Sequence, residues 1–178
     1  MPHSNGKLVW LTGLAGSGKT TIGREVYKNL KNGDDNVVFL DGDGIREIFG
    51  NDLGHDPEDR LKNAWRIAKL CRFLVEQGLV VVCSTMSLYK EIHEYNRELD
   101  GRYFEVYIHA PLEELVRRDQ KGLYSRALKG EINHVVGVDL PFDKPAQNHI
   151  EIDNTELNRL EDKAEKILAM IWEKNKAV

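Results

Sequence analysis

The stretch GLAGSGKT at residues 13–20 constrains the fold of this chain more than any other feature. It matches the phosphate-loop pattern G-x-x-x-x-G-K-[ST], and it lies between a short apolar run (7–13) and a segment with helical spacing (20–33). Glycines let the backbone curl around an anion, and the following helix contributes the positive end of its dipole. An ordinary glycine turn is the alternative, but the flanking strand and helix favour a site for ATP or GTP.

Individual residues of this loop have expected contacts. Lys19 would reach the β- and γ-phosphates as a catalytic residue, and the Thr20 hydroxyl would ligate Mg²⁺. ATP is therefore the expected co-substrate and Mg²⁺ the expected cofactor. The predicted nucleotide-binding residues in the loop are Gly13, Ala15, Gly16, Ser17, Gly18, Lys19, Thr20 and Thr21.

The remaining segments alternate between strand and helix patterns. Strands are expected at 36–43, 79–84, 103–110 and 149–154, and helices at 56–78, 88–99, from Pro111 onward and at 155–176. Strands separated by helices form a parallel sheet covered on both faces. We therefore predict an α/β fold of the P-loop NTPase type, with a parallel five-stranded sheet flanked by helices. It would form a single kinase domain over residues 1–178, with a glycine- and charge-rich lid at approximately 118–145.

Composition narrows the possible partners. A net charge of −4 argues against a nucleic-acid-binding surface, which normally requires a basic domain. No apolar run approaches the roughly 18 residues of a membrane span, and the first ten residues lack the apolar core of a signal peptide. We expect a cytoplasmic protein that contacts neither nucleic acid nor membrane.

Polar residues that follow the strands should meet at one edge of the sheet, because ligands of parallel sheets bind at the carboxyl ends of the strands. Asp41 is the candidate carboxylate that accepts or orients the proton of an acceptor hydroxyl. Asp43 would contact substrate or a water-bridged metal. Arg46, Arg60 and Asn63 suit an anionic, hydrogen-bonding acceptor, since guanidinium groups bind phosphate bidentately. Solvated surface side chains are the alternative for each of them.

Several motifs together resemble those of adenylyl-sulfate (APS) kinases along nearly the whole chain. They are LDGDGIR, LGHDPEDRLKNAWRIAKL, FEVYIHAPLEELVRRDQKGLY, KGEI and GVDLPFDKP, in addition to the phosphate loop. The resemblance implies transfer of phosphate from ATP to the 3′-hydroxyl of adenosine 5′-phosphosulfate, with Mg²⁺, in a homodimer. It implies that Asp41 is the base, that Arg118 lies near the ATP adenine, and that Lys121 and Leu123 close over the acceptor.

Three departures from this family's pattern concern the acceptor. His55 and Val135 stand where the family usually has aromatic residues that stack on the acceptor's adenine, and TMSLY (85–89) replaces the usual I-S-P-Y-R. We predict a pocket altered for a different nucleotide. The predicted acceptor-binding residues are Asp43, Arg46, His55, Arg60, Asn63, Ser84, Thr85, Met86, Lys121, Leu123 and Val135.

Four functions remain open from the sequence. The first is an APS kinase with a looser pocket, and the second is a cytidine diphosphoramidate kinase of capsule biosynthesis, an activity of the wider family. The third is a small-metabolite kinase of the shikimate or gluconate type, which would not predict the D-R-x-x-N and K-G-L-Y motifs. The fourth is a non-catalytic nucleotide-binding module, which would need neither Asp41 nor a lid.

Overall fold

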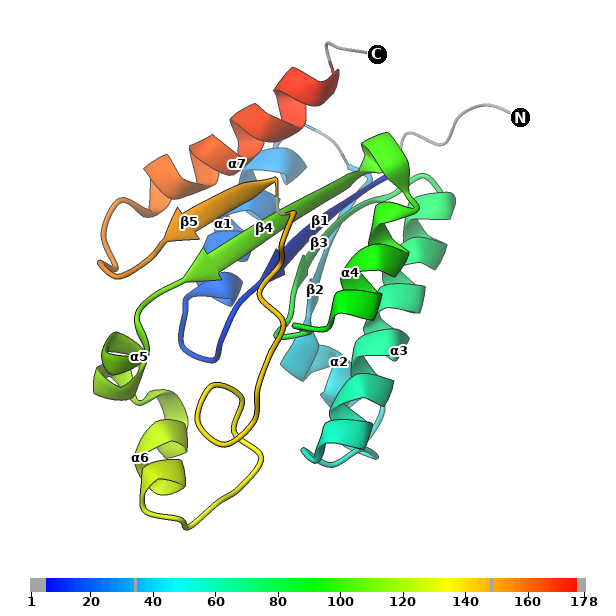
Figure 1. Cartoon of the computed structure of the whole chain (residues 1–178). Coiled ribbons are helices and arrows are strands. Elements are labelled where there is room, and N and C mark those ends of the chain that lie inside the picture. Colours follow the sequence, from blue (N-terminus) through cyan, green and yellow to red (C-terminus); the bar gives the residue numbers. More distant parts are fainter. Residues whose placement is uncertain (1–5, 34, 148, 176–178) are drawn as a thin grey trace.

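The computed structural model describes residues 6–33, 35–147 and 149–175. The two ends of the predicted domain, residues 1–5 and 176–178, lie outside this part, and so does the last residue of the predicted closing helix. The described chain folds as an α/β structure in which a sheet is covered by helices on both faces (Figure 1).

A five-stranded parallel sheet forms the centre, in the order β2-β3-β1-β4-β5, as the strand–helix alternation predicted. β1 is the central strand, where Leu8 pairs with Val81 of β3 on one side and with Tyr103 of β4 on the other. Its side chains are almost all buried, which explains why the strand reads as a continuous apolar run. The strands are β1 (Lys7–Thr12), β2 (Val37–Asp41), β3 (Val80–Ser84), β4 (Tyr103–His109) and β5 (Ile150–Asp153).

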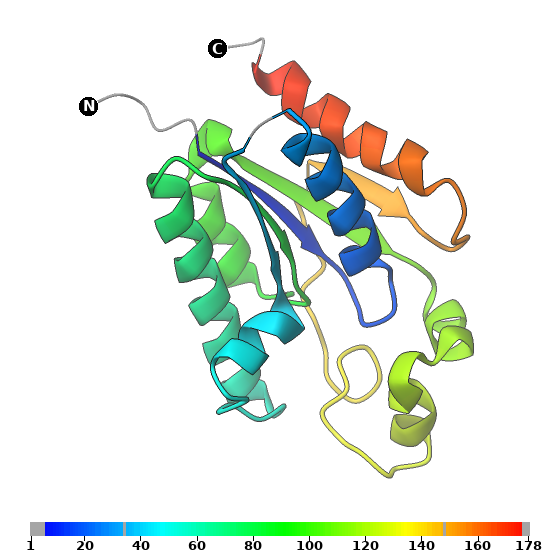
Figure 2. The same ribbon diagram turned by 180° about the vertical axis from the view of Figure 1, so that it is seen from behind.

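Helices divide between the two faces of the sheet (Figures 1 and 2). On one face α1 (Lys19–Lys31) packs against α7 (Leu160–Asn175), and on the other α3 (Pro57–Glu76) packs against α4 (Lys90–Arg97). Three shorter helices lie at the ends of strands or beyond them: α2 (Gly42–Ile48), α5 (Leu112–Arg118) and α6 (Leu123–Leu128). Within the described residues, no helix is both long enough and apolar enough to cross a membrane.

The end of β2 differs from the prediction. The strand expected over 36–43 ends at Asp41, and α2 begins at Gly42. Asp41 caps this helix, because its Oδ1 accepts hydrogen bonds from the backbone N–H of Asp43 (3.0 Å) and of Gly44 (3.5 Å). Two glycines in the first turn disfavour a helix by propensity, and the cap offsets that cost.

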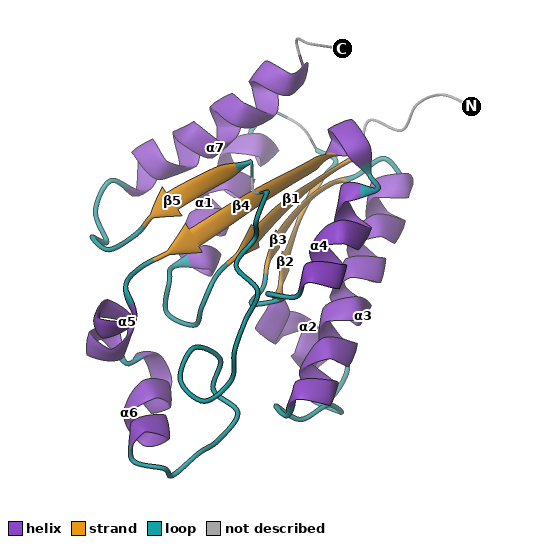
Figure 3. Cartoon of the chain, in the orientation of Figure 1, coloured by secondary structure: helices purple, strands orange, loops and turns teal. Residues whose placement is uncertain are grey.

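The segment predicted as a lid is more ordered than its composition suggested. It contains α6, and a long loop then leads back to β5 (Figure 3). Tyr124 of α6 is fully buried and donates its O–H to the carbonyl of Ala15 (2.8 Å) in the phosphate loop. Val135 is also buried, in an apolar cluster that includes Leu14 and Leu115. The segment therefore packs directly on the phosphate loop.

A buried charged cluster stabilises β4 away from the phosphate loop. Glu105 is fully buried and accepts hydrogen bonds from Tyr103 Oη (2.8 Å) and from Arg97 Nη2 (2.7 Å). His93 Nδ1 lies 2.5 Å from the same carboxylate. Burial favours the neutral acid, but the bonds from His93, Tyr103 and Arg97 hold the pKa of Glu105 below its usual range.

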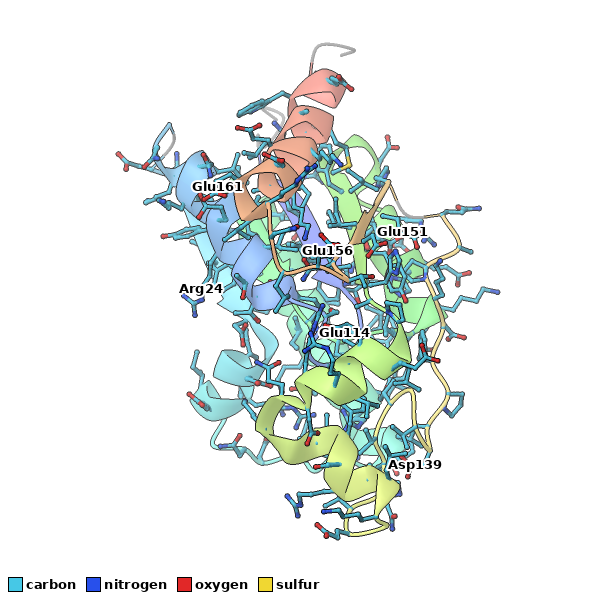
Figure 4. All side chains as sticks on the ribbon, turned by 90° about the vertical axis from the view of Figure 1, so that its left-hand side faces the viewer. Arg24, Glu114, Asp139, Glu151, Glu156 and Glu161 are labelled. Atoms are coloured by element: carbon cyan, nitrogen blue, oxygen red, sulfur yellow. The ribbon has the colours of Figure 1, made fainter. Side chains whose placement is uncertain are left out.

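Glu105→Ala is expected to lower the free energy of unfolding by about 3–5 kcal/mol, because it removes a fully buried carboxylate and leaves the buried Tyr103 hydroxyl and the partly buried Arg97 guanidinium without their partner. Glu151→Ala is the matched control. That carboxylate is half-exposed and pairs with Lys144 (3.0 Å) and His109 (3.3 Å), so about 1 kcal/mol or less should be lost (Figure 4). Urea unfolding followed by circular dichroism measures both, and equal losses would contradict the assigned role.

Candidate active site

One cavity of about 870 Å³ lies at the carboxyl ends of β1, β2 and β3. The phosphate loop and the start of α2 border it on one side, the beginning of α3 on another, and the α6 segment on a third. This is the edge at which ligands of parallel sheets bind.

The phosphate loop holds a conformation that needs glycine. Gly16 and Gly18 have φ of 76° and 98°, and a Cβ on Gly18 would lie 2.2 Å from Asn154 Nδ2. That amide donates to the carbonyl of Ser17 (2.7 Å), so the start of α1 is held by the chain after β5. Of the predicted nucleotide-binding residues in the loop, those that line the cavity are Ala15, Gly16, Lys19 and Thr20, whereas Gly13, Ser17, Gly18 and Thr21 lie outside its lining.

Lys19 points back over the loop that carries it. Its Nζ donates to the carbonyl of Leu14 (2.7 Å). Burial lowers the pKa of Lys19 to about 8, against the attraction of Asp43 and Asp41, which raises it. In the free protein this ammonium group is charged below that pH and largely neutral above it, so a polyphosphate that binds at higher pH must first see it take up a proton.

ATP binding is therefore expected to weaken as the pH rises from 7 to 9.5, because the charged form of Lys19 is lost near pH 8 in the free protein. Isothermal titration of ATP into the protein at several pH values measures this. In Lys19→Arg the cation stays charged throughout this range, so its Kd should change less with pH. Identical profiles for the two proteins would assign the pH dependence to another group.

Thr20 and Asp41 bring two oxygen ligands together beside the loop. The Thr20 hydroxyl donates to Asp41 Oδ2 (2.7 Å), which leaves its own lone pairs free for a cation. Mg²⁺ prefers oxygen ligands and is usually held by one or two carboxylates together with substrate phosphates. The described residues contain no group of three or more His, Cys, Asp or Glu side chains that could hold a metal without substrate. The pair thus fits a cation that arrives with ATP.

Arg118 connects three segments around the phosphate loop. It donates to the carbonyls of Gly16 (3.1 Å), Asn154 (2.6 Å) and Thr155 (2.8 Å). Its Nε also donates to Glu114 (2.8 Å), which lies on α5 between the sheet and α6 (Figure 4). The residue does not line the cavity, and its predicted position near the ATP adenine stays a prediction.

All eleven residues predicted to bind the acceptor line this one cavity, although they come from four separate parts of the chain. They are Asp43, Arg46, His55, Arg60, Asn63, Ser84, Thr85, Met86, Lys121, Leu123 and Val135. Their roles toward an acceptor stay predictions, since proximity alone does not assign them.

The two arginines have structural contacts that the sequence did not indicate. Arg46 Nη1 donates to the carbonyls of Leu53 (3.0 Å) and Gly54 (3.1 Å). Arg60 donates to the carbonyl of His55 (2.6 Å) and, across the cavity, to that of His134 (2.9 Å). Both guanidiniums thus order the loop before α3, and Arg60 also ties that loop to the α6 segment.

Three exposed side chains that line the cavity are those of Lys121, Asp43 and His55. Lys121 Nζ lies 3.3 Å from Asp43 Oδ2, and both side chains are largely exposed. His55 is exposed beside the arginines; partial burial and then the charges of Arg60 and Arg46 lower its pKa. A neutral imidazole is therefore expected at this point near pH 7.

Several lining residues were not among the predicted acceptor contacts, including Gln120, Arg126, Ile132, Asn133 and Val136. Arg126 could have been added to them, since it lies three residues after Leu123 and so shares a face of the same helix. Gln120 begins a three-residue 3₁₀ helix and the others lie in an irregular loop, where periodicity gives no signal.

Comparison with known proteins gives consistent matches. The sequence model of the family described as adenylylsulphate kinase matches residues 5–153. A cytidine diphosphoramidate kinase from Campylobacter jejuni is 47% identical over 165 residues, covering 93% of this chain and 96% of that protein. An adenylyl-sulfate kinase from Halothermothrix orenii is 38% identical over 174 residues, covering 98% and 94%.

A solved structure agrees with these sequence matches. The APS kinase of Mycobacterium tuberculosis, in complex with AMPPNP and APS, superposes with a TM-score of 0.83 at 32% identity. The match covers 93% of this chain and 97% of that one.

Proposed function

This chain belongs to the adenylylsulphate kinase family, and from that premise we propose that its acceptor is cytidine diphosphoramidate, phosphorylated by ATP at the 3′-hydroxyl. Adenosine 5′-phosphosulfate is the second candidate, since several curated relatives of this chain are adenylyl-sulfate kinases.

The choice between the two acceptors rests on how few aromatic side chains line the cavity. Among the described residues that line the cavity, the only aromatic rings are those of His55 and Tyr89. A buried Val135 takes the place of the lid aromatic that the family pattern expects. Stacking of a base on an aromatic side chain is worth about 1–3 kcal/mol, so a purine held without that ring binds less well. A pyrimidine is smaller than a purine and loses less when that aromatic side chain is missing. The relative with 47% identity is also named for a cytidine acceptor.

The cavity residues would have three roles in the reaction: binding ATP, activating the acceptor hydroxyl and binding the anionic part of the acceptor. Lys19 and the N–H groups of the loop hold the β- and γ-phosphates of ATP. Asp41 accepts the proton of the attacking 3′-hydroxyl, or orients it, and the hydroxyl oxygen attacks the γ-phosphorus while the bond from that phosphorus to the β–γ bridging oxygen breaks and ADP leaves. Arg46, Arg60 and Lys121 face the anionic part of the acceptor.

Mg²⁺ would be held by the Thr20 hydroxyl, with Asp41 next to it. When bound, it neutralises charge on the transferring phosphoryl group. Chelation with EDTA is expected to abolish turnover, and restoring Mg²⁺ should recover it. Full activity in the chelator would contradict this part of the proposal.

Three further parts rest on the family resemblance: a single kinase domain, closure of the segment at approximately 118–145 over the acceptor, and a homodimer. Light scattering tests the dimer, which would show twice the mass of the chain. Limited proteolysis of that segment, with and without ATP and acceptor, tests closure, since a closed lid should be cleaved more slowly.

An acceptor panel tests the proposed function. ADP release with Mg·ATP would be measured against cytidine diphosphoramidate, CDP, adenosine 5′-phosphosulfate, shikimate and gluconate. The expected result is the highest kcat/KM for cytidine diphosphoramidate, with the product phosphorylated at the 3′ position. A preference for adenosine 5′-phosphosulfate would reject the proposed acceptor and leave the kinase family unchanged.

A further inference from the structure

Three uncharged polar side chains are buried and yet line the cavity. Asn63 extends from α3, while Thr85 and Ser87 follow β3. Each is about 5–6% exposed, yet all three line the cavity. The two hydroxyls bond each other at 3.0 Å, and Asn63 Oδ1 has no hydrogen-bond partner among the described residues. We call these three residues the polar floor.

An unsatisfied buried carbonyl has an energetic consequence. A buried acceptor without a donor costs free energy comparable to a lost hydrogen bond. A ligand that offers an N–H group at this point removes the cost, whereas one without such a group keeps it. Sites built in this way reject the wrong ligand more strongly than apolar sites do.

The polar floor is uncharged, whereas several other residues that line the cavity are cations. Arg46, Arg60, Lys121 and Arg126 also line it, and these cations suit the anionic diphosphate portion of an acceptor. The floor carries no charge, so it suits a neutral polar edge. In a nucleotide that edge belongs to the base.

We propose that the polar floor selects an aminopyrimidine base, with Thr85 and Ser87 as the specificity-determining residues beside Asn63. The Asn63 Oδ1 atom is buried in the free protein, and a turn of the side chain toward the cavity lets it accept a hydrogen bond from the exocyclic amino group. The bonded hydroxyl pair retains one hydrogen, which it donates to the ring nitrogen of the base; in uracil that nitrogen carries a hydrogen of its own and cannot accept. Uracil presents a carbonyl in place of the amino group, so it leaves Asn63 Oδ1 unpaired there. This inference rests on the proposed cytidine acceptor.

The test compares two acceptors that differ only in the base: cytidine diphosphoramidate and its uridine counterpart. In the wild-type enzyme kcat/KM is expected to favour cytidine by about tenfold to a hundredfold, the range for one unsatisfied buried group. Thr85→Val keeps the shape and removes the hydroxyl, and Ser87→Ala removes its partner. Each should reduce the cytidine-to-uridine ratio about tenfold, through KM, without changing KM for ATP.

Two controls accompany these variants. Thr85→Ser restores a hydroxyl and should restore the wild-type ratio. Ser125→Ala removes a hydroxyl of α6 that lies outside the cavity lining and bonds the carbonyl of Gly122 (3.4 Å), so the ratio should stay unchanged. Thermal unfolding of each variant confirms that it is folded at the assay temperature.

Two results would overturn the inference while the proposed function stands. In the first, Thr85→Val and Ser87→Ala lower kcat/KM equally for both bases, which would assign the hydroxyls to the sugar or to the framework. In the second, neither variant changes kcat/KM for either base. A wild-type enzyme that uses adenosine 5′-phosphosulfate and neither pyrimidine acceptor would instead reject the proposed function, before any variant is measured.

Discussion

Asp41→Asn is expected to lower kcat by about 10²–10⁴-fold, because an amide cannot accept the proton of the attacking hydroxyl. The change is conservative for the fold. The amide oxygen can still cap α2 by accepting from the N–H of Asp43, as the carboxylate does at 3.0 Å. Single-turnover transfer from ATP to the acceptor measures the chemical step directly, and thermal unfolding should show little change.

Asp43→Asn provides the comparison for this result. Asp43 lies largely exposed, 3.3 Å from Lys121, and is expected to contribute to acceptor binding. Its replacement should raise KM for the acceptor more than it lowers kcat. The opposite pattern, in which Asp43→Asn stops the chemical step and Asp41→Asn does not, would transfer the role of base to Asp43.

Lys19→Met is expected to lower kcat/KM by about 10²–10³-fold, the loss that follows removal of one preorganised donor to a charged transition state. Methionine keeps most of the length of the lysine stem, so the cavity should remain filled. The affinity for ATP should fall as well, because the group that faces the phosphates is lost. Steady-state kinetics with varied ATP measures both effects.

Lys19→Arg is the matched control for that variant. It keeps the positive charge but places it on a wider, planar group, so it should recover part of the binding and less of the rate. Turnover by Lys19→Met at the wild-type rate would show that the loop binds nucleotide without taking part in transfer.

Much of the fold could be predicted because the core strands are apolar on both sides. The run LVVV before Cys83 favours a strand buried on both faces, and so does YFEVYIH at 103–109 apart from Glu105, whose burial depends on its charged and polar partners. The α2 helix could not be predicted, because its first turn contains two glycines and its stability depends on the Asp41 side chain. The α6 segment was predicted as a lid from its glycines and charges, and this composition could not show that Tyr124 within it is fully buried.

The sequence motifs predicted which residues meet at the candidate site, but they did not predict the hydrogen bonds that these residues make. Spacing brought Arg60 and Asn63 to one helix face, and strand ends brought Ser84 and Asp41 together. No local pattern could show that Arg60 bonds the carbonyl of His134, which lies 74 residues away in the chain. Non-local hydrogen bonds of this kind depend on the finished fold.

The central position of β1 affects how the chain acquires its structure during synthesis. Leu8 of β1 pairs with Val81 and with Tyr103, so this strand has no sheet neighbour until β3 is made and only one until β4 is made. At roughly 5–20 residues per second, synthesis from Leu8 to Tyr103 takes about 5–20 s. During this interval Val9, Trp10 and Leu11 lack part of the sheet that buries them in the folded chain. The same order of strands that gathers the phosphate loop and the acceptor residues at one edge thus leaves β1 open to aggregation until β4 has been made.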